Sequence, residues 1–152
     1  MNIQKAEDIV ATMQMQAEAK KQSLTVHTEQ LACAAVYSDS LRLRQVLLNI
    51  LGNGVKFNKV GGLISLQIKE ERNAPEGCAK YKFVIRDTGI GMSKEFQKHI
   101  FEPFARAETA TVSGIQGTGL GMAITKKIID MMNGTITVKS KLGEGTELSV
   151  ST

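Results

Sequence analysis

The chain has 152 residues and a net charge of +4, and its hydrophobic fraction of 42% is enough to form the core of one domain. Basic and acidic residues are interleaved and only 5% of the residues are aromatic, so a nucleic-acid partner is not expected. The two cysteines, Cys33 and Cys78, match no metal-binding or redox spacing. No apolar run approaches the roughly 18 residues that span a membrane, and no secretory signal is present. We therefore expect a single cytoplasmic domain, residues 1–152, cut from a parent protein that could itself be membrane-anchored.

Hydrophobic periodicity, taken in chain order, predicts blocks of helices and strands without a regular alternation of the two. The predicted elements are a helix at 4–21, a strand at 23–30, a helix at 38–57, strands at 63–69 and 81–87, a short helix at 94–101, a helix at 121–134, and strands at 135–140 and 146–151. Gly134 is expected to end the last helix, and 141–145 to form a hairpin turn. This order favours an α+β fold, a two-layer sandwich with helices on one face of a mixed, mostly antiparallel sheet.

Two segments have more than one interpretation. The helix within residues 1–21 is either the first helix of the domain or the remnant of a linker to another domain. Residues 102–120 are small, polar and without periodicity, and loops of that length in a compact domain are often functional lids.

A polar stripe runs along the helix predicted at 38–57. Its members share one helical face at spacings of four, four and three residues: Gln45, Asn49, Asn53 and Lys56. A carboxamide oxygen is a hard, neutral ligand that suits Mg²⁺, and a lysine amine is a point charge for phosphates. The stripe is therefore either a solvated helix face or a site for magnesium and phosphate.

The second motif, "DTGIGM" at 87–92, follows directly on a predicted strand. Gly89 and Gly91 permit backbone conformations and close approaches that side chains would forbid. Asp87 could accept a hydrogen bond from an exocyclic amine of a base. The alternative is an ordinary polar turn with its usual preference for aspartate and glycine.

The third motif is "FEPF", in which Phe101 and Phe104 flank a proline at the start of the predicted lid and Arg106 follows. It is either a hydrophobic anchor for a loop or the hinge of a lid that carries a phosphate-binding arginine.

The fourth motif is "GTGLG" at 117–121, which leads into a helix. Its backbone N–H groups could form an anion site at the helix N-terminus. The motif does not follow a strand, so it is not a dinucleotide-binding fingerprint, and no Walker sequence is present.

The four motifs together resemble the N box, first glycine box, F box and second glycine box of sensor histidine kinases, in that order. The resemblance covers the chain from about residue 20 to the end, and it implies the Bergerat fold shared with the DNA gyrase, Hsp90 and MutL ATPases. It implies ATP and Mg²⁺ as cofactors, with Asn53 as the magnesium ligand and Asp87 as the acceptor for the adenine amine. The positions to which it assigns nucleotide contacts are Asn49, Asn53, Lys56, Phe57, Asp87, Gly89, Gly91, Met92, Phe101, Phe104, Arg106, Gly117, Thr118, Gly119, Leu120, Gly121 and Thr146. The second glycine box departs from the family pattern at Gln116, where a first glycine is usual.

The resemblance further implies a protein histidine kinase that donates the γ-phosphate of ATP to a histidine on a separate dimerisation domain. Related ATPases carry a glutamate at the position of Asn49, and a carboxamide cannot act as a general base for hydrolysis. Neither His27 nor His99 has the sequence context of an acceptor histidine, so no catalytic residue of the transfer is expected within this chain. The other expected partner is the receiver domain of a response regulator, and the isolated domain is expected to be monomeric.

Three alternatives stay open from the sequence. One is the nucleotide-binding lobe of a Bergerat-fold ATPase, and another is a kinase of the same fold that acts on a different residue. The last is a degenerate module that docks partners without catalysis.

Overall fold

The computed structural model describes residues 3–28, 40–71, 80–102 and 121–151. Its strands form one five-stranded sheet in the order β1-β2-β3-β5-β4. The strands are β1 (Ser23–Thr28), β2 (Leu63–Glu71), β3 (Lys80–Asp87), β4 (Thr135–Lys141) and β5 (Gly145–Ser151). β1 pairs with β2 in parallel, and the other three pairings are antiparallel. The sheet is therefore mixed and mostly antiparallel, as predicted.

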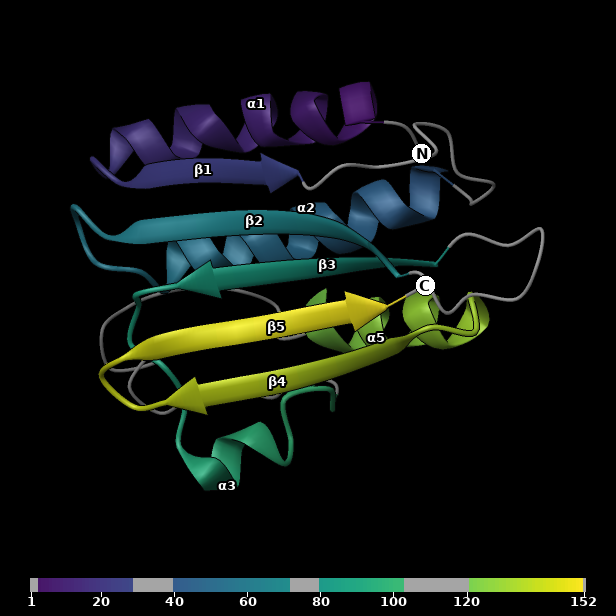
Figure 1. The fold of residues 1–152 in the computed structure, drawn as a ribbon. Coiled ribbons are helices and arrows are strands. Elements are labelled where there is room, and N and C mark those ends of the chain that lie inside the picture. The colour runs from purple at the N-terminus through teal and green to yellow at the C-terminus, as the bar shows by residue number, and fades with distance from the viewer. Residues whose placement is uncertain (1–2, 29–39, 72–79, 103–120, 152) are drawn as a thin grey trace.

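Helices α2 and α5 lie behind the sheet in Figure 1, α1 runs along the β1 edge, and α3 lies beyond the β4 edge. The helices are α1 (Ile3–Ala19), α2 (Ser40–Lys56), α3 (Lys94–Gln97) and α5 (Gly121–Met131). α2 contacts α1 on one side and α5 on the other, and it also lies against β2 and β3. This central position brings the polar stripe of α2 close to the carboxyl end of β3.

One apolar layer lies between the helices and the sheet. Its largest fully buried members come from α1, α2, α5 and two strands, β2 and β5: Ile9, Leu47, Ile50, Leu51, Ile64, Leu66, Ile129, Val46 and Val150. On β4 the side chains alternate between exposed and partly buried, because only one face of this edge strand meets the helical layer. The predicted two-layer α+β arrangement is confirmed.

The ends of two helices show a feature that the sequence did not reveal. Asn133, with φ of 57°, takes the left-handed conformation after α5, and the N–H of Gly134 donates to the carbonyl of Ile129 at 2.9 Å. The C-cap expected at Gly134 therefore lies one residue earlier, at Asn133. Asparagine tolerates the left-handed region better than most residues with a side chain. Asn133 can therefore take this conformation, and Gly134 is the residue that follows it. Lys21, with φ of 54°, ends α1 in the same way.

The short helix predicted at 94–101 is confirmed only over its first turn. α3 ends at Gln97, and Ser93 caps it by accepting a hydrogen bond from the N–H of Phe96. No helix in the described ranges is long and apolar enough to cross a membrane.

Candidate functional site

Asp87 ends β3 beside the C-terminal part of α2, and its carboxylate is half-buried there. The N–H of Gly89 donates to Oδ1 of Asp87 at 2.9 Å, and the N–H of Thr146 donates to the same carboxylate. Burial raises the pKa of the Asp87 carboxyl above its ordinary value of 3.8, while these two hydrogen bonds lower the pKa by less. Asp87 is therefore held in one orientation by the backbone, with part of its accepting capacity left for another donor.

The glycines around Asp87 allow three backbone segments to meet. A Cβ atom on Gly89 would lie 2.6 Å from the carbonyl oxygen of Phe57, at the end of α2. Gly91 has φ of 68°, and a side chain there would collide with the carbonyl of Lys141 at the end of β4. Gly145 has φ of 117°, and a side chain there would collide with the carbonyl of Asp87 itself. Close packing therefore requires glycine at these positions. An ordinary polar turn, the alternative interpretation of this motif, would not require it.

A hydroxyl pair fixes the strand side of the site. Ser140 donates from Oγ to the carbonyl of Gly145 at 2.8 Å and accepts from the N–H of Met92 at 2.8 Å. The Oγ1 of Thr146 lies 2.9 Å from the same Ser140 hydroxyl. Gln97 adds a second bridge, because its Nε2 donates to the carbonyls of both Met92 and Ser140. Met92 and Thr146 are thus joined by Ser140 of β4, and Gln97 of α3 holds Met92 to the same strand.

The stripe on α2 lies on one face of the helix, as predicted. Asn49 and Asn53 are partly buried, and Gln45 is exposed. The Nδ2 of Asn49 lies 3.3 Å from Oγ1 of Thr125 and 3.4 Å from the carbonyl of Gly121, both on α5. The stripe therefore faces the N-terminus of α5, where the second glycine box ends.

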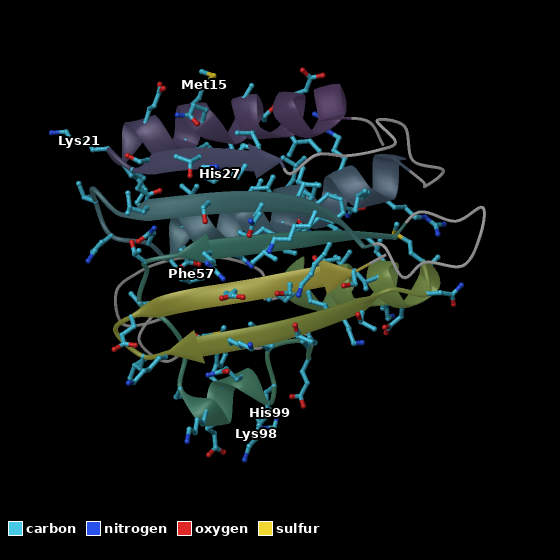
Figure 2. All side chains as sticks on the ribbon, viewed as in Figure 1. Met15, Lys21, His27, Phe57, Lys98 and His99 are labelled. Carbon is cyan, nitrogen blue, oxygen red and sulfur yellow. The ribbon has the colours of Figure 1, made fainter. Side chains whose placement is uncertain are left out.

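The C-terminal end of the stripe carries a cation and an aromatic ring. The Nζ of Lys56 lies 5.9 Å from the ring centroid of Phe57, within the range of a cation–π contact. Phe57 is partly buried at the end of the sheet where Lys21 projects, as the labels in Figure 2 show. Phe57 thus adjoins the loop that follows Asp87, because the N–H of Ile90 donates to the carbonyl of Phe57 at 3.1 Å. Asn53 and Lys56 lie in the same last turn of α2.

Part of the expected site lies outside the described residues. Phe101 is described and packs, partly buried, against the apolar core. The lid positions and most of the second glycine box fall in 103–120: Phe104, Arg106, Gly117, Thr118, Gly119 and Leu120. The roles expected for these positions stay predictions.

Sequence reasoning missed several residues that hold the site together. They are Ser140, Gln97, Gly145, and the buried Asn58, whose Nδ2 donates to the carbonyl of Leu63 and whose Oδ1 accepts from Thr88. Ser140 and Gln97 occur in ordinary strand and helix patterns, which contain no signal of their contacts. Gly145 could have been found, because it precedes Thr146 in the "GEGT" motif.

The two described histidines lie near opposite edges of the sheet in Figure 2, His27 on edge strand β1 and His99 just after α3. Both side chains are exposed, and Nδ1 of His99 lies 2.8 Å from Oε1 of Glu102. These are the environments of surface histidines, as the sequence predicts.

Residues 38–152 match the family described as histidine kinase-, DNA gyrase B- and HSP90-like ATPases. Among curated relatives, the chain is 43% identical over 114 residues to the peroxide stress-activated histidine kinase mak2 of Schizosaccharomyces pombe, covering 74% of this chain and 5% of that protein. It is 33% identical over 145 residues to the sensor protein GacS of Pseudomonas syringae pv. syringae, covering 95% of this chain and 16% of that protein. The chain therefore spans less than a fifth of the length of these relatives.

Solved structures of similar fold include full-length ShkA in complex with AMPPNP, with a TM-score of 0.80 and 28% identity over 99% of this chain and 30% of that one. The catalytic domain of the histidine kinase ThkA also aligns with a TM-score of 0.80. Its identity is 21%, and the alignment covers 99% of this chain and 91% of that one. At 21% identity, the similarity to ThkA concerns the fold alone.

Proposed function

The chain belongs to the family of histidine kinase-, DNA gyrase B- and HSP90-like ATPases, and from that premise we propose that it binds Mg-ATP as the catalytic lobe of a sensor histidine kinase. The resemblance seen in the four sequence motifs is confirmed at the level of the family. The observation that carries the proposal is the Asp87 carboxylate, which two backbone N–H groups orient within a loop of closely packed glycines.

The donor set fits an adenine nucleotide. A carboxylate offers about four lone-pair positions, of which the N–H groups of Gly89 and Thr146 occupy two. Asp87 would use another to accept a hydrogen bond from the exocyclic amine of adenine. Gly54 of α2 packs beside this carboxylate, because an added Cβ atom there would lie 3.9 Å from Oδ2 of Asp87. Met92 and Thr146, joined through Ser140, would form the wall behind the base.

The stripe on α2 fits the phosphates and the metal. When bound, Mg-ATP would supply the transferable phosphoryl group and a cation that neutralises its charge. Asn53 would hold the magnesium through its carboxamide oxygen, and Lys56 would pair with a phosphate. The partly buried position of both side chains supports these roles, since ordinary solvated residues of a helix face are mostly exposed.

The stripe favours phosphoryl donation over hydrolysis. Asn49 provides no carboxylate that could take a proton from water, and its amide nitrogen is directed at Thr125 and Gly121 of α5. Phosphoryl transfer depends mainly on positioning and charge neutralisation, so a site without a base suits an incoming nucleophile that is itself reactive. We propose that this nucleophile is a histidine on a dimerisation domain of the parent protein, which then passes the phosphoryl group to a receiver domain.

Calorimetric titration with a nonhydrolysable ATP analogue, with and without Mg²⁺, tests the binding site. We expect the wild-type chain to bind, and Asp87→Asn to weaken binding about tenfold or more, because the amide presents a donor where the adenine amine requires an acceptor. Asn53→Ala should remove only the gain in affinity that Mg²⁺ brings.

The exposed residue Gln45 supplies the matched control on the same helix face, and Gln45→Ala should bind as the wild type does. If the wild-type chain binds no nucleotide under either condition, the proposal is wrong. A wild-type chain that binds but turns ATP over rapidly on its own would instead favour a Bergerat-fold ATPase.

A further inference from the structure

The end of α2 is also held by a lysine that no sequence motif includes. Lys20 follows α1, and its ammonium group donates to three carbonyl oxygens, those of Val55 at 2.8 Å, Lys56 at 3.2 Å and Asn58 at 3.0 Å. An ammonium group has three N–H donors, so this set uses its full capacity. The carbonyls at a helix C-terminus lack partners within the helix and carry partial negative charge, which makes a cation a suitable cap.

Gln22 adds to this cap from the start of β1. Its Nε2 donates to the carbonyls of Val55 at 3.0 Å and Lys59 at 3.2 Å. The side chain is 5% exposed, and its Oε1 has no hydrogen-bond partner. Lys20 and Gln22 together attach the connection between α1 and β1 to the last turn of α2.

The carbonyls of the turn at the end of α2 have different hydrogen-bond partners. The carbonyls on both sides of Phe57 point to Lys20, while the carbonyl of Phe57 accepts from the N–H of Ile90 in the glycine loop. Gly89 packs against the same Phe57 carbonyl. The turn thus divides its carbonyls between two partners, Lys20 and the N–H of Ile90.

We propose that Lys20 is a positioning residue of the nucleotide site, which acts through the Val55–Asn58 turn on Lys56, Phe57 and the loop that follows Asp87. This inference rests on the proposed function, since it concerns the same site. Lys20 itself donates to backbone carbonyls of the turn, so its effect on a ligand is transmitted through the backbone.

The test compares Lys20→Met, which keeps the aliphatic stem and removes the ammonium group, with Lys20→Arg, which keeps the charge. Lys21→Met is the matched control, because its exposed side chain adjoins Lys20 in sequence. We expect Lys20→Met to bind the nonhydrolysable ATP analogue with Mg²⁺ about tenfold more weakly, the loss typical of hydrogen bonds to a charged group. Lys20→Arg should recover most of the affinity, and Lys21→Met should bind as the wild type does.

Amide hydrogen exchange in the ligand-free chain separates positioning from general loss of stability. In Lys20→Met the amide of Ile90 should exchange faster while amides in the centre of β2 and β3 change little, because only the turn loses its support. Met13→Ala, which removes a buried side chain of α1, serves as the destabilised reference. It should speed exchange in the core without a specific effect at Ile90.

If the wild-type chain binds the ATP analogue and Lys20→Met binds it with the same affinity, the inference is wrong. Uniform acceleration of exchange in Lys20→Met, matching that of Met13→Ala, would also overturn it by assigning Lys20 a merely structural role. If the wild-type chain itself binds no nucleotide, the proposed function fails, and exchange at Ile90 still decides whether Lys20 orders the turn.

Discussion

At the scale of single residues, Asp87 combines two opposing effects. Its partial burial disfavours the ionised carboxylate, whereas the hydrogen bonds from Gly89 and Thr146 favour it. Burial is the larger effect, so the pKa of this carboxyl lies above 3.8 in the folded chain. Ionisation of Asp87 therefore costs folding free energy. A buried carboxyl with a shifted pKa is typical of a functional site, which agrees with the proposed role of Asp87 as an acceptor for a ligand.

The raised pKa predicts how Asp87 affects stability as the pH changes. The folded chain holds the proton more tightly than the unfolded chain, so the contribution of Asp87 to the free energy of unfolding is fully present below pH 3.8. It is lost as the pH rises through the folded pKa. We therefore expect the free energy of unfolding of the wild type, minus that of Asp87→Asn, to fall with rising pH over this window and to be constant above it.

Urea unfolding of both chains at a series of pH values measures this difference, and subtraction removes the contributions of the other carboxyl groups. Parallel curves for the two chains across the window would contradict the prediction.

At the scale of elements, glycines in this chain serve two different purposes. Gly52 lies in the middle of α2, where a Cβ atom would meet only the terminal methyl group of Met13 at 3.9 Å. Gly91 lies in the loop after β3 with φ of 68°, and a side chain there would collide with the carbonyl of Lys141. The helical glycine is tolerated, whereas the loop glycine is required by the approach of two backbone segments.

Alanine substitutions should separate the two glycines. Gly52→Ala should raise the free energy of unfolding by about 0.5–1 kcal/mol, since alanine has the higher helix propensity and its methyl group fits the available space. Gly91→Ala should lower it by at least about 1–2 kcal/mol, the usual cost of a side chain in the left-handed region, with the collision at Lys141 in addition.

Urea unfolding monitored by circular dichroism measures both changes. A stabilised Gly91→Ala chain, or a strongly destabilised Gly52→Ala chain, would show that the packing of α2 or of the glycine loop differs from the arrangement described here.

At the scale of the whole molecule, the chain matches only a small part of the length of its relatives. It covers 16% of the length of GacS and 5% of that of mak2. Its described histidines are exposed at the surface, and His99 is engaged with Glu102. We infer that phosphoryl transfer requires a domain of the parent protein beyond these residues.

The isolated chain should therefore bind ATP without phosphorylating itself. Incubation with ATP labelled at the γ-phosphate, followed by detection under alkaline conditions that preserve phosphohistidine, should leave the chain unlabelled. Addition of the dimerisation domain of the parent protein is the positive control and should produce label on that domain alone. Label on His27 or His99 would contradict the prediction.

The local patterns of the sequence were sufficient for most of the elements and for the motifs that define the candidate site. Period-3.6 spacing predicted α2, whose apolar face is buried and whose stripe from Gln45 to Lys56 lies on a different face. Strand patterns between turn signals predicted all five strands, and the order of elements predicted a mixed sheet with helices on one face. Such features depend on neighbours in the chain, so one sequence suffices to reveal them.

Other features were decided only when distant segments came together. The meeting of Asp87 with Thr146 follows from the pairing of β3 with β5, and the Ser140 bridge follows from the pairing of β4 with β5. Lys20 belongs to no motif, and its role arises because α1 packs along α2 and ends beside the last turn of that helix. Contacts of this kind join residues that are far apart in the chain, so they depend on tertiary packing, whereas the sequence by itself determined which segments were available to pack.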